Sequence, residues 1–249
     1  AHAARRNGLT VIMTEETDWI GGQLTQQGVP PDEHKWIEKY GATALYREFR
    51  TAVRKYYRDN YPLTEQAAVE PLLNPGNAMV SAISHEPRVA LKVLEQMFAP
   101  NVSARKLVIL KEYHAAEAII NGNVVKSLIV ESFRDGGKKK LEGNYFVDAT
   151  ELGDLLPLTG TTYVTGSESK GETGELHAAT QANYNNNQAF TVCFAMDYIK
   201  GENWVIKKPE DYQFWRDFVP KMTPPWSGKL LDLSYSNPKT LEKKILGFH

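Results

Sequence analysis

The sequence of 249 residues is poor in several features that mark particular classes of protein. Its single cysteine, Cys193, excludes an internal disulfide and a cysteine-cluster metal site. The apolar run around Cys193 predicts a buried, unreactive thiol. No apolar run approaches the length that crosses a bilayer, so no membrane-spanning segment is predicted. The net charge of −1 gives no reason to expect a nucleic-acid partner.

The motifs of several common chemistries are also missing. The sequence has no Ser-His-Asp order, no zinc-binding pattern and no phosphate-binding loop. His34 follows a run of loop-forming residues, but no second histidine lies at helical spacing from it, so no metal site is predicted. The composition, with 42% hydrophobic and 24% charged residues, is that of an ordinary globular protein.

The stretch from Thr10 to Thr25 organises the rest of the chain. A short apolar run predicts a buried strand, and the alanine- and arginine-rich segment before it predicts a helix that ends at an Asn-Gly pair. Glu15 follows the strand, as in the second half of a dinucleotide-binding βαβ unit, where an acid at the strand tip accepts hydrogen bonds from ribose hydroxyls. Glu15 is the predicted ribose ligand, because Glu16 lies one residue into the loop.

Three stretches together resemble the FAD-dependent oxidoreductases with a glutathione-reductase-type FAD fold: VIMTEETDWIGGQLT, GVPPDEH and VDATELGDLLPLTG. The resemblance implies FAD as the cofactor and hydride transfer between the flavin and a small-molecule substrate. It identifies no catalytic residue. The residues that it implies at the cofactor are Glu15, Gly21, Gly22, Gln23, Leu24, Thr25, His114, Ala149, Thr150, Gly153 and Asp154.

The chain departs from this family in two respects. The N-terminal G-x-G-x-x-G turn is missing, and Glu151 stands where the family usually has a glycine. The sequence therefore resembles a fragment. In the complete fold the strand before the glycine turn would lie between the strands at 10–14 and 145–149. Without it, we expect these two strands to face an empty slot or to pair directly, and the isolated chain to be unstable and not to hold FAD.

Residues 26–80 are expected to form a helical insertion. Leu45, Phe49 and Val53 recur at helical spacing together with a tyrosine pair, which predicts a face that packs against the sheet domain. The alternative is that one or two tyrosines of this segment face the flavin or the substrate. A substrate-side role of His34 also stays open, because its loop follows the glycine pair directly.

Residues 81–180 are predicted to continue the FAD-binding domain. Ser84 is expected to cap a helix, since it stands just ahead of a proline in the first turn, and Pro100 is expected to end that helix. The apolar run at 107–110 predicts a strand that lies beside the strand at 10–14 in a parallel sheet.

Turn signals then predict a small antiparallel meander. An Asn-Gly pair lies between the apolar runs at 115–120 and 124–130. An Asp-Gly pair then separates the second run from a last strand expected at 145–147. Three lysines, Lys138–Lys140, are expected at an exposed hairpin tip. Asp148 either belongs to the cofactor site or serves as a turn or cap carboxylate.

The predicted fold is α/β: a partial Rossmann-like parallel sheet with an antiparallel meander, a helical insertion and the start of a substrate domain. That last domain is expected to begin near a strand at 190–196.

Two alternatives to an FAD-dependent oxidoreductase stay open: a non-catalytic nucleotide-binding fragment and an NAD-dependent enzyme, since Glu15 would bind an NAD ribose equally well. A cytoplasmic location is favoured, and the oligomeric state is not predicted. The predicted domains are the FAD-binding domain at 1–25 and 81–180, the helical insertion at 26–80 and the substrate domain at 181–249.

Overall fold

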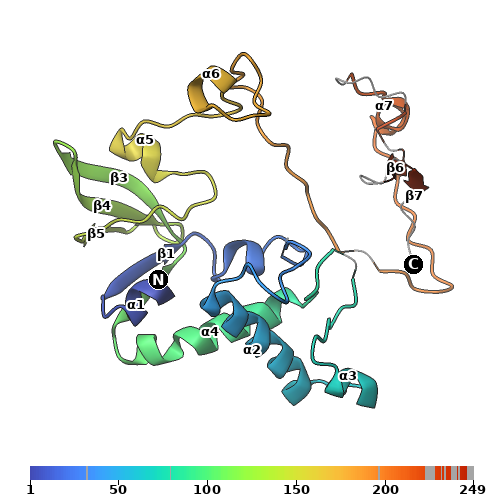
Figure 1. The fold of residues 1–249 in the computed structure, drawn as a ribbon, viewed down its shortest axis with the longest axis horizontal. Helices are drawn as coiled ribbons and strands as arrows, with labels where there is room; N and C mark the ends of the chain where they lie inside the picture. Colours follow the sequence, from blue (N-terminus) through green and yellow to red (C-terminus); the bar gives the residue numbers. More distant parts are fainter. Residues whose placement is uncertain are drawn as a thin grey trace. The chain divides into compact units, whose positions relative to one another are not determined.

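The computed structural model describes residues 1–31, 33–78, 80–195, 197–221, 228–230, 232, 234–236, 240 and 242–245. The chain divides into two compact units, Ala1–Ala195 and Met196–His249 (Figure 1). The second unit contains a short helix and an antiparallel strand pair: α7 (Tyr212–Asp217), β6 (Ser234–Ser236) and β7 (Lys243–Ile245). All other elements lie in the first unit.

A parallel pair of strands stands at the start of the first unit. Helix α1 (His2–Arg6) leads into β1 (Val11–Glu15), which pairs in parallel with β2 (Leu107–Lys111), as the sequence predicted. Glu15 lies opposite Lys111, so both strands end at the same edge. Strand β1 is less buried than predicted. Its side chains alternate between two faces, and those of one face, including Ile12, are exposed.

The predicted meander is present with a different third strand. β3 (Tyr113–Asn121) and β4 (Val124–Ser132) form the expected hairpin, and β5 (Lys138–Glu142) pairs with the other edge of β4. The lysines expected at a hairpin tip therefore form an edge strand. Edge strands tolerate exposed charge, and Lys138 also pairs with Glu131 at 3.4 Å.

Two segments predicted as strands are not strands among the described residues. Residues 145–147 leave Tyr145 83% exposed. Of the strand predicted at 190–196, residues 190–195 leave Phe190 90% exposed, and Met196 lies outside the described residues. Cys193, predicted to be buried, is exposed for the same reason. A strand forms only where a neighbouring strand supplies backbone donors and acceptors, and no described strand lies beside either segment. Residues 145–149 accordingly do not pair with β1.

The first unit has its main core between two long helices. α2 (Ala44–Asn60) has the predicted apolar face, and its buried residues Phe49, Val53 and Tyr57 pack with Val89 and Val93 of α4 (Pro87–Ser103). The Thr43 hydroxyl caps α2 by accepting a hydrogen bond from the Tyr46 N–H at 3.2 Å. The other helical elements are η1 (Gly22–Leu24), α3 (Glu65–Val69), α5 (Leu155–Thr159) and α6 (Lys170–Thr173).

The ends of α4 differ from the prediction. Its N-cap is Glu86, while the Ser84 hydroxyl contacts the Ser81 carbonyl instead of the helix. Pro87 at the first helical position needs no N–H partner, which explains why the helix starts there. Pro100 lies inside the helix, because the last turn is closed behind it by a hydrogen bond from the Ala104 N–H to the Pro100 carbonyl at 3.1 Å.

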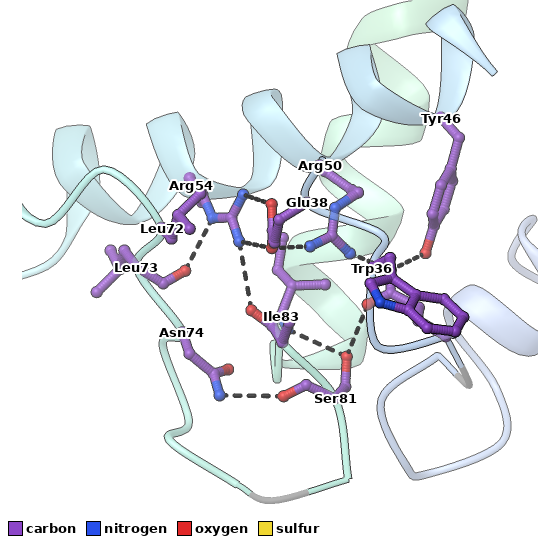
Figure 2. Close-up of polar contacts among 12 residues, drawn as sticks. Trp36, Glu38, Tyr46, Arg50, Arg54, Leu72, Leu73, Asn74, Ser81 and Ile83 are labelled. Carbon is purple, nitrogen blue, oxygen red and sulfur yellow. Dashed lines mark hydrogen bonds and ion pairs between the residues drawn. The ribbon is translucent and has the colours of Figure 1, made fainter. Parts of the chain in front are cut away.

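A network of buried ion pairs joins α2 to the loop before it (Figure 2). Arg50 pairs with both Glu33 and Glu38, and Arg54 donates to Glu38 through two nitrogens at 2.5 and 3.1 Å. The side chains of Arg50, Arg54 and Glu33 are each less than 10% exposed, so water screens these charges only weakly.

The same network reaches the loop that precedes α4 (Figure 2). The Arg54 guanidinium donates to the Leu73 carbonyl at 2.9 Å and to the Ala82 carbonyl at 3.3 Å. The Ser81 hydroxyl donates to Glu33 at 3.2 Å, and the Tyr46 hydroxyl donates to the same carboxylate. Three segments of chain are thus held by one set of charge-assisted hydrogen bonds, which are stronger than those between neutral groups.

Replacing Arg54 by alanine leaves the Glu38 carboxylate, which is only 20% exposed, paired with Arg50 alone. We expect Arg54→Ala to lower the free energy of unfolding by about 3–5 kcal/mol. Lys55→Ala on the same helix removes an exposed pair with Asp59 and should cost only about 0.3–0.5 kcal/mol. Urea denaturation of the two variants measures the difference, and similar losses would show that the network contributes little.

The network also makes stability depend on pH. Burial acts to raise the pKa of Glu38, but the hydrogen bonds and charges of Arg54 and Arg50 hold it below the ordinary value of 4.5. The unfolded state then binds this proton more readily than the folded state.

The contribution of Glu38 to the free energy of unfolding is therefore fully present above pH 4.5, the ordinary pKa of the side chain. It is lost as the pH falls through the lower pKa that Glu38 has in the folded protein. We expect Glu38→Gln to be less stable than the wild type at neutral pH, with a gap that narrows on acidification. Denaturation midpoints at a series of pH values test this. The exposed Glu65→Gln serves as the control, and a gap independent of pH would refute the prediction.

Candidate cofactor site

The carboxyl edge of the parallel strand pair presents an oriented carboxylate. Glu15 ends β1, and its Oε1 accepts hydrogen bonds from the Thr17 N–H and hydroxyl, both at 3.0 Å. Its Oε2 accepts no hydrogen bond from the described residues. Glu16 is exposed and has no such support. The carboxylate of Glu15 is thus held in place with one oxygen left to accept donors from a ligand.

The segment that precedes His114 is bonded to the loop after Glu15. The Glu112 N–H donates to the Thr17 carbonyl at 3.1 Å, and the Glu112 carbonyl accepts from the Phe133 N–H at 2.8 Å. His114 is the second residue of β3 and stacks on Phe133, with ring centroids 4.5 Å apart. The structure therefore places the chain near His114 at the same edge as Glu15.

One glutamine links this edge to the glycine turn. The Gln26 side-chain amide, just beyond η1, donates to the Thr17 hydroxyl at 2.9 Å and to the Trp19 carbonyl at 2.8 Å. The Thr17 hydroxyl also lies 2.7 Å from the Trp19 carbonyl, so its one proton is shared between this carbonyl and Glu15. The loop after β1 is therefore folded back against the end of the turn.

Gly21 is required by packing inside the glycine turn. Its φ is 126°, and an added Cβ would lie 2.6 Å from the Thr25 side chain and 2.9 Å from Leu94 of α4. Thr25 is buried, and its hydroxyl donates to the Ile20 carbonyl at 2.9 Å, so that hydroxyl is already used within the turn. Leu24 packs against the core of α2 and α4, whereas Gln23 is exposed.

Gly22 is instead open toward a second loop. Its φ is 50°, and an added Cβ would lie 3.3 Å from the Oε1 of Glu151. The structure thus brings the glycine turn together with residues 148–154. Glu151 was not among the expected cofactor residues. Its only sequence signal was its place between the expected residues Thr150 and Gly153, where the resembling family has a glycine.

Internal hydrogen bonds hold the 148–154 loop in shape. Asp148 accepts from the N–H and hydroxyl of Thr150 at 3.0 and 2.8 Å and from the Leu155 N–H at 2.9 Å. Although burial acts to raise the pKa of Asp148, these hydrogen bonds hold it below its ordinary value. Asp148 is thus a turn carboxylate that also caps the first turn of α5, the second of the roles that the sequence left open.

The remaining expected residues lie along this loop. The Thr150 hydroxyl accepts from the Asp154 N–H at 2.8 Å, and Gly153 has a φ of 73°, which favours glycine. Ala149 and Thr150 are exposed, so the backbone here is open to a ligand. Small side chains and left-handed glycines let a ligand approach the chain closely.

The residues present fit an extended dinucleotide such as FAD. A free carboxylate oxygen stands at the strand tip, a ligand position at the carboxyl edge of parallel strands. The glycine turn follows it and is joined to that edge through Thr17 and Gln26. The 148–154 loop in turn approaches Gly22 through Glu151. The described part of the chain contains no group of three or more metal-binding side chains, and none of its helices is both long and apolar enough for a membrane span.

We expect substitutions of Gly21 and Gly22 to lower the free energy of unfolding by different amounts. Gly21→Ala adds a methyl group against Thr25 and Leu94, and overpacking of this kind costs about 1–3 kcal/mol, with backbone strain added to it. Gly22→Ala meets only the end of a flexible glutamate side chain, so we expect the strain alone, about 1–2 kcal/mol. Urea denaturation compares the two, and an equal or larger loss for Gly22→Ala would contradict the geometry.

A family model described as FAD dependent oxidoreductase matches residues 1–246. No curated protein matches the chain with significant sequence similarity. A solved structure of glycerol-3-phosphate dehydrogenase from Bacillus halodurans, complexed with FAD, is 14% identical with a TM-score of 0.30, over 57% of this chain and 29% of that one. That likeness covers less than a third of the dehydrogenase and supports no comparison of sites. The family match spans nearly the whole chain, and the protein belongs to the FAD-dependent oxidoreductases.

Proposed function

We propose that this protein binds FAD along the edge described above and passes hydride between the flavin and a small-molecule substrate. This proposal replaces the expectation, drawn from the missing first strand, that the isolated chain would not hold FAD. The observation that carries the proposal is the free oxygen of Glu15, which Thr17 orients at the carboxyl end of β1. An acid in this position accepts hydrogen bonds from ribose hydroxyls. The family match supports FAD over NAD as the dinucleotide.

The expected residues take distinct parts in this proposal. Glu15 binds the adenosine ribose, and the backbone around His114 lies against the adenine. Gln23, Leu24 and Thr25 run alongside the flavin and contribute backbone groups, since the Thr25 hydroxyl is bonded within the turn and Leu24 packs into the core.

The second loop completes the proposed cofactor site. Ala149, Thr150 and Gly153 offer close backbone approach, and Asp154 accepts a hydrogen bond from the ribityl chain. Gly21 and Gly22 shape the turn that faces this loop. The glycine turn and the loop extend beyond the adenosine half, which is the part that FAD and NAD share. This extent favours FAD over the two alternatives, an NAD-dependent enzyme and a non-catalytic nucleotide-binding fragment.

When bound, FAD supplies the hydride acceptor, and the protein supplies binding, orientation and electrostatics. We assign no general base. The proposed substrate domain includes the second unit, and its residues would select the substrate. The function is tested by incubating the purified protein with FAD or with NAD and removing free nucleotide by gel filtration. Retention of FAD alone supports the proposal, and retention of NAD alone would overturn it.

Exchange of Glu15 tests the ribose assignment. Loss of a hydrogen bond to a charged acceptor costs about 1.5–3 kcal/mol, so we expect Glu15→Ala to weaken FAD binding roughly ten- to a hundredfold. Glu16→Ala removes the same charge from the neighbouring residue and should leave the affinity nearly unchanged. Quenching of flavin fluorescence measures both dissociation constants, and equal weakening would show that the effect is one of general charge.

A further inference from the structure

Glu151 is the point at which the two proposed flavin-side segments approach each other. Its Oε1 lies 3.3 Å from the position of a Cβ on Gly22. The loop around it is shaped by other residues, since Asp148 and Thr150 make the internal hydrogen bonds. Glu151 makes no hydrogen bond to these residues, so its carboxylate does not serve the structure of the loop.

The charge of Glu151 also has no partner within the described residues. The ion pairs of this part of the structure do not include it, and the side chain is exposed. The charged groups on the same loop, Asp148 and Asp154, have the same sign. The carboxylate of Glu151 lies against the open side of the glycine turn, where it is not tied to another residue of the loop.

We propose that Glu151 faces the bound flavin and disfavours negative charge on it, which lowers the reduction potential of the cofactor. The proposal rests on the proposed FAD site. Reduction of flavin by two electrons with uptake of one proton adds one negative charge to the ring system. A fixed carboxylate nearby repels that charge and so favours the oxidised form.

This assignment gives a reason for the departure from glycine at this position. A glycine would add no charge at this position, whereas glutamate adds a negative charge that repels the reduced cofactor more strongly than the oxidised one. A lower potential makes the reduced flavin a stronger hydride donor. Glu151 therefore shifts the equilibrium of the reaction toward the passing of electrons from the flavin to its acceptor.

The test is the midpoint potential of the FAD-loaded protein, measured by spectroscopic titration against a reference dye. Glu151→Gln keeps the shape of the side chain and removes its charge, and Glu151→Gly removes the side chain altogether. We expect both variants to favour reduction by about tenfold, which for a two-electron couple is a rise of about 30 mV. Glu175→Gln, an exposed glutamate beyond α6, is the control and should leave the potential unchanged.

The outcomes separate this proposal from the function on which it rests. An unchanged potential in Glu151→Gln, with FAD bound normally, overturns the role of Glu151 and leaves the proposed function standing. An equal rise in Glu175→Gln also overturns it, because the effect would then be one of net charge. If the wild-type protein binds no FAD at all, the proposed function fails and this proposal fails with it.

Discussion

The ion pairs of Arg50 and Arg54 with Glu33 and Glu38 are the constraint on which the first unit depends most. Charges this buried lose the stabilisation of water, and only complete pairing compensates them. The buried apolar side chains of the loops that they hold are Ile37, Leu73 and Ile83, of which Leu73 and Ile83 belong to the main core. The network therefore fixes the loops against α2, which shares one core with α4. Leu24 packs on that core, and Gly21 lies beside Leu94 of α4.

The proposed cofactor site is built differently, from short polar contacts along exposed backbone. Thr17 orients Glu15, and Gln26 draws the following loop back toward the glycine turn. Ile20, Leu24 and Thr25 anchor this region in the interior. A rigid helical body thus carries loops that are open to a ligand, which is the usual division between scaffold and binding site.

Local sequence patterns predicted many of the helices and strands. The predictions failed where the structure of a segment depends on residues that are distant in the sequence. The spacing of Phe49 and Val53 predicted α2, and an Asn-Gly turn predicted the β3–β4 hairpin. Residues 145–147 and 190–195 have strand-like sequences but no described neighbour to pair with. The ionic network has no periodic signal, because Glu33 meets Arg50, and Glu38 meets Arg54, only in the folded chain. Glu151 likewise gained meaning only when the fold placed it against Gly22.

The central claim is that three separated segments form one FAD site on a preformed helical body. Hydrogen exchange measured by mass spectrometry, with and without FAD, tests it most directly. The account predicts that FAD slows exchange together in residues 15–26, 112–115 and 148–155, while α2 and α4 are already protected without it. Slowed exchange confined to other parts of the chain, or in only one of the three segments, would contradict the account.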